Sequence, residues 1–318
     1  MFHYRGLSNL FYRDVPRNCT DFLALTGYVG ISALEKLDEL NFNSTIIYGL
    51  FNENKNPVIH NKLTQLHNDR KKIFYPKILC HSKCYLWLDG EEIIKGVVGS
   101  ANFSSNGLEN DYRESLVEVD QRQLRIIKGY IDIIQRSSVE CTEVVLGEPE
   151  QETEPEPEQV QGKVCEMVLY DPSTGEVQPS TGLNWGLSER GHVRLNDASI
   201  TIRTDHIRRY PNLFPPLDPV PDPRRRNLLQ VIEFIWDDET VMKGRLEGSQ
   251  PVNGKKYPKQ ITSFPNKDIL GRYIRERIGV PSGQRVTRQD LRNYGRDTIT
   301  LSLLEEGVYY VDFSPREE

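Results

Sequence analysis

The stretch ILCHSKCYLWL at residues 78–88 gives the strongest indication of the fold of this chain. Its apolar and aromatic residues give it the composition of a β-strand. Because side chains alternate along a strand, His81, Lys83 and Tyr85 are expected on one face. The imidazole of His81 and the ammonium of Lys83 therefore point the same way.

The next stretch, GVVGSANFSSNGLENDYRESLVEV at residues 96–119, predicts two more strands. A Gly-Ser turn separates them, with Asn102 close behind it, and the last strand contains Glu114. To the N-terminal side, the β-like run STIIYGLF at 44–51 alternates with the helical pattern ISALEKLDEL at 31–40. This alternation predicts an α/β domain.

An acidic segment separates this domain from the remainder of the chain. Residues 143–163 hold 7 acidic and 1 basic residues, whereas residues 1–142 hold 17 of each and residues 164–318 hold 22 of each. The segment is rich in Glu, Pro and Gln, so it is unable to bury a core and is expected to be extended. We assign residues 1–145 to a first domain, 146–163 to a linker and 164–318 to a second domain.

The second domain is expected to be mainly β. Its short β-like runs are separated by Pro and Gly clusters, as in an all-β barrel or sandwich, and one helix, DILGRYIRERIG at 268–279, interrupts them. The runs are ASITIRT at 198–204, LLQVIEFIW at 228–236, TITLSLL at 298–304 and VYYVDF at 308–313.

Composition indicates a soluble protein that stays in a reducing cytoplasm. The first residues lack the apolar core of a signal peptide, and no stretch has the length of apolar sequence that a membrane span requires. The five cysteines are odd in number and scattered, which does not suggest a disulfide framework. Because both domains are neutral overall, any affinity for nucleic acid requires locally clustered Lys and Arg.

The four polar residues of the first domain have a chemistry that suits phosphodiester cleavage. A neutral imidazole such as His81 is a competent nucleophile near pH 7 when an acceptor such as Glu114 orients its other nitrogen. Lys83 and Asn102 supply an ammonium and an amide that stabilise charge on the equatorial oxygens of a pentacoordinate phosphorus. No cluster of metal-binding carboxylates is needed, and we expect no cofactor.

The order His81-Ser82-Lys83, then Gly99-Ser100-Ala101-Asn102-Phe103, then an acidic residue resembles the phospholipase D superfamily. The resemblance implies that His81 forms a covalent phosphohistidine, while Lys83 and Asn102 hold the nonbridging oxygens. Only one copy of the motif is present, although a second His must protonate the leaving oxygen. Relatives with a single motif pair two subunits, which implies a homodimer with a composite active site.

Some assignments in this domain have alternatives. The family often has an Asp a few residues after the Lys, but here Asp89 is one position late and Asp89-Gly90 is more typical of a hairpin turn. Glu109 and Glu118 are substitutes for Glu114. Cys80 and Cys84 flank His81, yet their spacing without a second pair does not favour zinc, and we expect them to be core residues.

Segments of the second domain at 182–202, 254–280 and 287–313 resemble the specificity half of restriction endonucleases of the NgoFVII and BfiI type. In these, a phospholipase-D-like nuclease precedes a pseudobarrel similar to the plant B-three DNA-binding domain. The resemblance implies two arms in the DNA major groove, where Arg and Lys bond guanine and Asn or Gln bond adenine. The candidate DNA-binding residues are Asn184, Trp185, Ser188, Arg190 and His192 on the first arm, Lys255, Lys256, Lys259 and Gln260 on the second, and Arg272 and Arg275 on the helix.

From these observations we expect the protein to be a type II restriction endonuclease that acts on double-stranded DNA in the cytoplasm of a prokaryote. Two alternatives stay open. One is a DNA-binding restriction subunit that depends on a partner ATPase. The other is a phospholipase-D-type lipid hydrolase, against which the DNA-reading domain argues.

Overall fold

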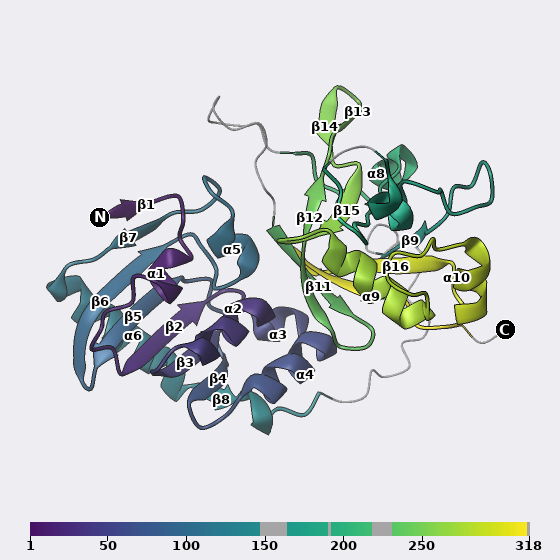
Figure 1. Ribbon diagram of the computed structural model, residues 1–318. Coiled ribbons are helices and arrows are strands. Elements are labelled where there is room, and N and C mark those ends of the chain that lie inside the picture. The colour runs from purple at the N-terminus through teal and green to yellow at the C-terminus, as the bar shows by residue number, and fades with distance from the viewer. Residues whose placement is uncertain (147–163, 190–191, 218–230, 317–318) are drawn as a thin grey trace. The chain divides into compact units, whose positions relative to one another are not determined.

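The computed structural model describes residues 1–146, 164–189, 192–217 and 231–316 (Figure 1). The chain folds as two compact units, Met1–Glu152 and Thr153–Glu318. The proposed linker at 146–163, apart from its first residue, lies outside the described residues. None of the described helices is long and apolar enough to cross a membrane.

An eight-stranded sheet forms the centre of the N-terminal unit, with strand order β1-β7-β6-β5-β2-β3-β4-β8. The neighbours β2, β3 and β4 are parallel, because helices connect them, and the other pairs are antiparallel. The strands are β1 (Phe2–His3), β2 (Asp21–Thr26), β3 (Asn43–Tyr48), β4 (Lys71–Pro76), β5 (Cys84–Asp89), β6 (Glu92–Gly99), β7 (Leu116–Glu118) and β8 (Ser138–Glu140). The helices are α1 (Asn9–Tyr12), α2 (Ile31–Glu35), α3 (Phe51–Asn54), α4 (Pro57–Leu66), α5 (Ser105–Glu109) and α6 (Gln121–Arg136), with 3-10 turns at Lys36–Glu39 and Cys141–Glu143.

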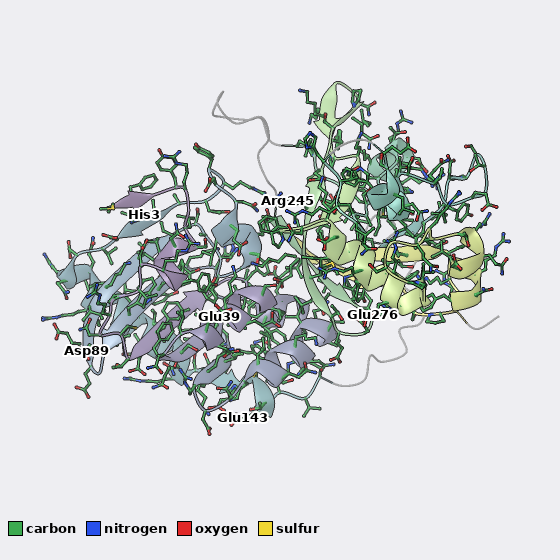
Figure 2. The ribbon with its side chains drawn as sticks, viewed as in Figure 1. His3, Glu39, Asp89, Glu143, Arg245 and Glu276 are labelled. Carbon is green, nitrogen blue, oxygen red and sulfur yellow. The ribbon has the colours of Figure 1, made fainter. Side chains whose placement is uncertain are left out.

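Strand β5 is buried on both faces. Its residues Cys84, Leu86 and Leu88 pack in one apolar cluster with Leu124, Ile131 and Ile134 of α6. On the opposite face, Tyr85 and Trp87 pack with Phe11, whose ring centroid lies 4.9 Å from that of Tyr85. The strand ends in the predicted hairpin, in which Asp89 pairs with Glu92 across Gly90 (Figure 2).

The strand predicted from residue 78 begins only at Cys84. Before it, the chain passes the end of β3, where the Cys80 amide donates to the Gly49 carbonyl oxygen at 2.9 Å. A Cβ atom on Gly49 would lie 1.9 Å from the Cys80 oxygen, so glycine is required at that crossing. His81 and Lys83 therefore belong to a loop at the end of the sheet.

In the C-terminal unit a seven-stranded sheet, in the order β10-β15-β12-β11-β17-β16-β9, curls into a nearly closed barrel. Its interior is one apolar cluster that includes Phe234, Trp236 and Phe313. The strands are β9 (Val164–Val168), β10 (Ile200–Thr201), β11 (Val231–Trp236), β12 (Val241–Glu247), β15 (Gln260–Ser263), β16 (Thr298–Glu305) and β17 (Val308–Asp312), and the separate hairpin is β13 (Gln250–Val252) with β14 (Lys255–Tyr257). The prediction of a mainly β pseudobarrel after an α/β domain is confirmed.

The C-terminal unit has more helix than the sequence predicted. The expected helix is present as α9 (Asp268–Ile278), but α8 (Thr204–Arg209), α10 (Arg288–Tyr294) and a 3-10 helix at Gly182–Leu187 are additional. Helix α8 begins at Thr204, the last residue of the segment 198–204 that was expected to be a strand. The signals of α10 were in the sequence, because Thr287 and Asp290 cap its start reciprocally and Gly295 ends it at φ 94°.

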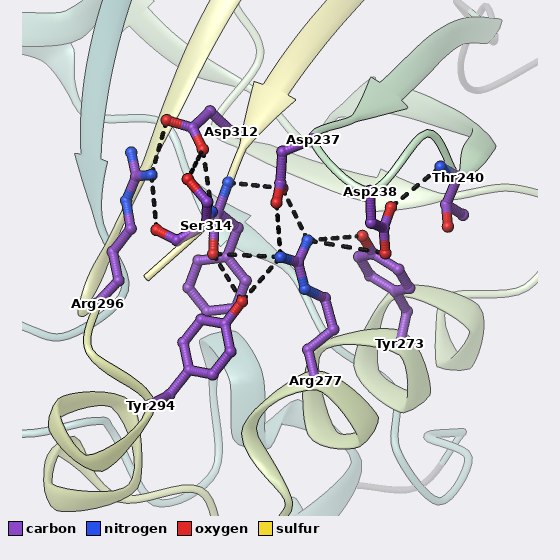
Figure 3. Close-up of polar contacts among 10 residues, drawn as sticks. Asp237, Asp238, Thr240, Tyr273, Arg277, Tyr294, Arg296, Asp312 and Ser314 are labelled. Carbon is purple, nitrogen blue, oxygen red and sulfur yellow. Dashed lines mark hydrogen bonds and ion pairs between the residues drawn. The ribbon is translucent and has the colours of Figure 1, made fainter. Parts of the chain in front are cut away.

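Arg277 of α9 fixes this helix to the barrel (Figure 3). Its guanidinium forms two hydrogen bonds of 2.7 Å to the Asp237 carboxylate, just after β11. It also donates to the hydroxyl groups of Tyr273 and Tyr294, at 2.9 and 2.8 Å. The hydrogen bond to Asp237 raises the pKa of Arg277 above its ordinary value, so the guanidinium stays charged.

Candidate active site and DNA interface

The α-carbon of Gly27, directly after β2, is the meeting point of three side chains. A Cβ atom built on Gly27 would lie 2.6 Å from His81 Cδ2, 3.2 Å from Asn102 Oδ1 and 3.3 Å from Lys83 Nζ. Only glycine allows all three to approach the backbone this closely. The structure therefore brings the imidazole, the amide and the ammonium together at the carboxyl end of β2.

Backbone contacts fix the orientation of the Asn102 amide. Its Oδ1 accepts hydrogen bonds from the Tyr28 amide at 3.1 Å and from Thr26 Oγ1 at 3.4 Å. Thr26 Oγ1 in turn accepts from the Phe103 amide at 3.1 Å. In the described part of the chain Asn102 Nδ2 has no partner, so its two N–H groups are available to an oxygen anion in the site.

Lys83 is held in place from within its own loop. Only 7% of its surface is exposed, and its Nζ donates to the carbonyl oxygen of His81 at 2.8 Å. Burial lowers the pKa of Lys83, while the negative charge of Glu114 acts in the opposite direction. An ammonium that has lost part of its hydration interacts strongly with an anion that enters the site.

The His81 imidazole is exposed to solvent and packs only lightly. The ring of Tyr28 meets it edge-on, with 6.4 Å between ring centroids. Among the described residues neither ring nitrogen has a hydrogen-bond partner. One nitrogen can therefore face a phosphorus atom while the other remains available to an acceptor.

Glu114 precedes β7 instead of lying within it. Burial lowers the pKa of Lys83, and the negative charge of Glu114 opposes that shift. The two substitute carboxylates are engaged elsewhere. Glu109 pairs with Lys36 at 2.7 Å, and Glu118 pairs with His3 at 3.2 Å.

The cysteines that flank His81 are part of the core. Cys80 and Cys84 are buried in the cluster formed with α6, and both are free thiols. Burial raises the pKa of Cys84 to about 11, so its thiol stays protonated at neutral pH. No group of three or more His, Cys, Asp or Glu side chains in the described ranges is arranged to hold a metal ion.

In the second domain, two of the predicted DNA-binding residues lie in the interior, which corrects the prediction. Asn184 is fully buried, and its amide bonds the backbone of Gln178 and Val286. Arg275 is 2% exposed and donates to the carbonyl oxygens of Leu183 and Gly271. Their polar groups are used inside the protein and are unable to reach a base edge.

The other predicted residues of the first arm lie nearer the surface. The ring of Trp185 is half-buried beneath the Lys267 ammonium, 4.2 Å from its centroid. Ser188 is half-buried as well, and His192 is exposed with a φ of 79°. Arg190 lies outside the described residues.

The second arm contains the hairpin β13–β14. Lys255 and Lys256 are exposed on it, and Asn253 and Gly254 form its tip with φ values of 48° and 77°. Just beyond the hairpin, Lys259 is also exposed. Two predicted residues already have acidic partners, since Gln260 donates to Glu247 at 3.0 Å and Arg272 pairs with Asp268 at 3.0 Å.

Comparison with protein families matches both halves of the chain. Residues 6–147 match the N-terminal PLD domain of the NgoFVII restriction endonuclease, and residues 160–305 match the NgoFVII C-terminal B3-like DNA-binding domain. The two matches follow each other and leave only short segments uncovered. The chain belongs to the NgoFVII restriction endonuclease family.

Membership in the NgoFVII family gives each unit a role. The N-terminal domain, which contains the site around Gly27, is the nuclease domain, and the barrel is the DNA-binding domain. The resemblance to the phospholipase D superfamily and to the NgoFVII type is thereby confirmed.

Solved structures include weaker similarities to this NgoFVII family member. NucT from Helicobacter pylori is 19% identical, with a TM-score of 0.31, and the match covers 38% of this chain and 82% of that one. Polyphosphate kinase from Porphyromonas gingivalis is 17% identical, with a TM-score of 0.28, and the match covers 43% of this chain and 20% of that one. A search of curated proteins found no match.

Sequence reasoning missed the residues that support the site in this NgoFVII family member. Gly27 provides the space in which the His81, Lys83 and Asn102 side chains meet, and Thr26 and Tyr28 orient Asn102. Their signal was the sequence Leu-Thr-Gly-Tyr directly after an apolar strand, since a glycine at a strand end often marks a close approach to the backbone.

Proposed function

We propose that this chain is a type II restriction endonuclease that hydrolyses DNA phosphodiester bonds at or near a short specific sequence in double-stranded DNA, through a phosphohistidine and without a metal ion. The observation that carries the proposal is the convergence of His81, Lys83 and Asn102 on Gly27. It supports the proposal because an imidazole lies beside an ammonium and an amide, which are both able to donate to an anion.

The proposed reaction has two displacements at phosphorus. In the first, a ring nitrogen of His81 bonds to phosphorus, the bond to one DNA oxygen breaks, and an acid delivers a proton to that oxygen. In the second, water attacks phosphorus, the nitrogen–phosphorus bond breaks, and the same group accepts the proton from water. Lys83 Nζ and Asn102 Nδ2 donate to the equatorial oxygens in both transition states.

Cleavage in the presence of chelator tests this mechanism. Plasmid DNA is incubated with the purified chain in excess EDTA, and the expected result is cutting at the rate seen without chelator. Rapid denaturation in detergent at alkaline pH, where a nitrogen–phosphorus bond is stable, should trap DNA phosphate on His81, and the His81→Ala chain should trap none. Loss of cutting in EDTA would overturn the metal-independent mechanism.

In the described residues of one chain, His81 is the only histidine that lies at Gly27, and a separate acid must protonate the leaving oxygen. The other three histidines of the nuclease domain have partners away from Gly27: His3 pairs with Glu118, His60 Nδ1 lies 3.1 Å from the Tyr75 hydroxyl, and His67 pairs with Glu140. We therefore propose a homodimer in which a second His81 acts as the acid.

A strip of exposed apolar side chains next to the site supports this homodimer. Ile126, Tyr130 and Ile133 share one face of α6, and Ile78 and Leu79 are exposed in the loop that leads to His81. The strip is continuous, since the Lys77 amide donates to the Ser137 oxygen and Ser82 Oγ lies 2.9 Å from the Tyr130 hydroxyl. Exposed apolar surface of this kind marks interfaces.

The double variant Ile126→Asp/Ile133→Asp tests the interface. It should be monomeric by light scattering and should cut DNA at least about a hundredfold more slowly, because the general acid is lost. Arg125→Asp, at an exposed position of α6 about 100° around the helix, is the matched control and should leave a dimer. A monomer that cuts DNA at the wild-type rate would contradict the proposal.

The same assays address the two alternatives. Cutting that requires cell extract and ATP would favour a restriction subunit that depends on a partner ATPase. Hydrolysis of phosphatidylcholine vesicles in place of DNA would favour a lipid hydrolase. The DNA-binding domain supports action on DNA, which we place in the cytoplasm of a prokaryote.

A further inference from the structure

We propose that an exposed aromatic cluster at β1, formed by Phe2, Tyr4, Tyr112 and Arg5, stacks on unpaired bases of the DNA strand that is being cut. The inference rests on the proposed nuclease function and adds a contact for single-stranded DNA next to the scissile phosphate. Phe2, Tyr4 and Arg5 precede residue 6, where the match to the nuclease family begins.

The members of the β1 aromatic cluster touch one another and remain open to solvent. The ring centroids of Phe2 and Tyr4 are 6.2 Å apart, and those of Tyr4 and Tyr112 are 5.7 Å apart. The Arg5 guanidinium lies 5.3 Å from the first tyrosine ring and 5.7 Å from the second. Phe2 is 64% exposed and Tyr4 is 43% exposed, so ring faces are available to a flat partner.

The backbone at Tyr112 is held in an unfavourable conformation that keeps its ring in the cluster. Its φ is 69°, in the left-handed region that a bulky aromatic residue rarely adopts. Two local bonds hold it, since the Tyr112 amide donates to the Tyr4 oxygen at 2.9 Å and Asp111 accepts from the Gly6 amide at 2.8 Å. Strain of this kind is often found at functional positions.

The β1 aromatic cluster lies at the same end of the sheet as the catalytic residues. The Gly99 amide donates to the Lys83 carbonyl oxygen, and Gly99 pairs with Leu116, which pairs with His3 on β1. The strand order β1-β7-β6-β5-β2 puts four strand spacings of about 4.8 Å between β1 and Gly27 at the end of β2, or about 19 Å in all. A stacked strand with a rise of about 3.4 Å per nucleotide covers that distance in about six steps.

The ligand that suits the chemistry of the β1 aromatic cluster is an unpaired DNA base. Every base has a π-face, and stacking on aromatic side chains is the main sequence-independent contact of proteins with single-stranded nucleic acid. Arg5 adds a cation that both bonds phosphate and stacks on bases. A paired base within a duplex has no free face, so the β1 aromatic cluster engages the strand only where pairing is open.

The experiment compares single-stranded and duplex binding in the full-length chain. His81→Ala serves as the parent, so that DNA is not cut, and Tyr4→Ala/Tyr112→Ala is introduced into it. A fluorescent thymidine 12-mer and a random-sequence duplex of the same length are titrated. We expect affinity for the single strand to fall by about tenfold or more, because each stacked base contributes about that factor, while duplex affinity changes less than about twofold.

The control is Tyr4→Phe/Tyr112→Phe, which keeps both rings and should bind the single strand as the parent does. Thermal unfolding verifies that every variant folds. Unchanged binding of the 12-mer by the alanine variant would overturn the inference, as would an equal loss of duplex and single-strand binding. Plasmid cutting by the wild-type chain is measured separately, so a failure of the nuclease proposal is distinguishable from a failure of this one.

Discussion

The two domains differ in how their predicted functional residues are used. In the nuclease domain, His81 and Lys83 come from the loop before β5 and Asn102 from the loop after β6, and they meet within a few ångströms of Gly27. In the DNA-binding domain, Asn184 and Arg275 are buried among backbone carbonyl groups, whereas Lys255 and Lys256 are exposed. Spacing within a motif is a strong guide to chemistry, but the residue type Arg or Asn does not distinguish a structural role from a DNA contact.

The largest expected effect is on the rate of DNA cutting, which should depend on the nuclease domain, while DNA affinity should depend on the barrel domain. His81→Ala should reduce DNA cutting by about ten-thousandfold or more, because the nucleophile is lost, while DNA affinity stays the same. His192→Ala, the exposed histidine of the barrel domain, should leave the rate of the cutting step at saturating enzyme unchanged. Single-turnover cleavage measures the rate of cutting, and a gel-shift titration measures DNA affinity. Cutting by His81→Ala near the wild-type rate would contradict the role of His81 as nucleophile.

Arg275 and Arg272 provide a matched pair within α9. Arg275→Ala should lower the free energy of unfolding of the barrel domain by about 3 kcal/mol, since it removes hydrogen bonds from a charged group and leaves carbonyl oxygens unsatisfied. Arg272→Ala, 59% exposed, should change stability by less than about 0.5 kcal/mol. Urea unfolding decides between these outcomes, and equal effects would show that the buried contacts are unimportant.

Gly27→Ala tests whether the site depends on close approach to the backbone. The added methyl group would lie 2.6 Å from His81 Cδ2 and displace the ring. A shift of about 1 Å in a reacting group costs about a hundredfold in rate, so cutting should fall by that factor while DNA binding and thermal unfolding are retained. Full activity in this variant would mean that His81 acts from another position.

The exposed lysines of the hairpin are expected to have smaller effects, and on binding alone. Lys255→Ala and Lys256→Ala should each weaken DNA affinity a few-fold and reduce the slope of log affinity against log salt by about 1, if each contacts one phosphate. A loss of discrimination between DNA sequences with no change in slope would instead indicate contact with bases. Binding titrations over a range of salt concentrations distinguish the two.

The smallest expected effect is on the pH dependence of stability. Burial lowers the pKa of His206 in the barrel domain below its ordinary 6.5. The unfolded chain therefore takes up a proton before the folded domain does, so stability is complete above pH 6.5 and is lost as the pH falls below it. His206→Gln should reduce the difference between urea unfolding at pH 5 and at pH 7.5; an unchanged difference would rule out His206 as a contributor.

The sequence by itself was sufficient for the class of both folds and for the family, and it supplied the residues of the proposed site. His-Ser-Lys followed by Gly-Ser-Ala-Asn-Phe specifies residue types at fixed spacing, and the alternation of β-like runs with turns predicts a barrel or a sandwich. These features are local, because strand periodicity and turn residues act over a few positions.

Only the tertiary structure decided which polar residues are buried and which backbone makes room for them. Gly27 and Thr26 are more than fifty residues from His81 in sequence, so no local pattern connects them. Arg275 has the same side chain as Arg272, but it is buried, and it donates to the backbone carbonyl oxygens of Leu183 and Gly271. Burial is a property of the packed chain. It distinguishes polar residues with a structural role, such as Arg275, from exposed residues that are free to contact DNA.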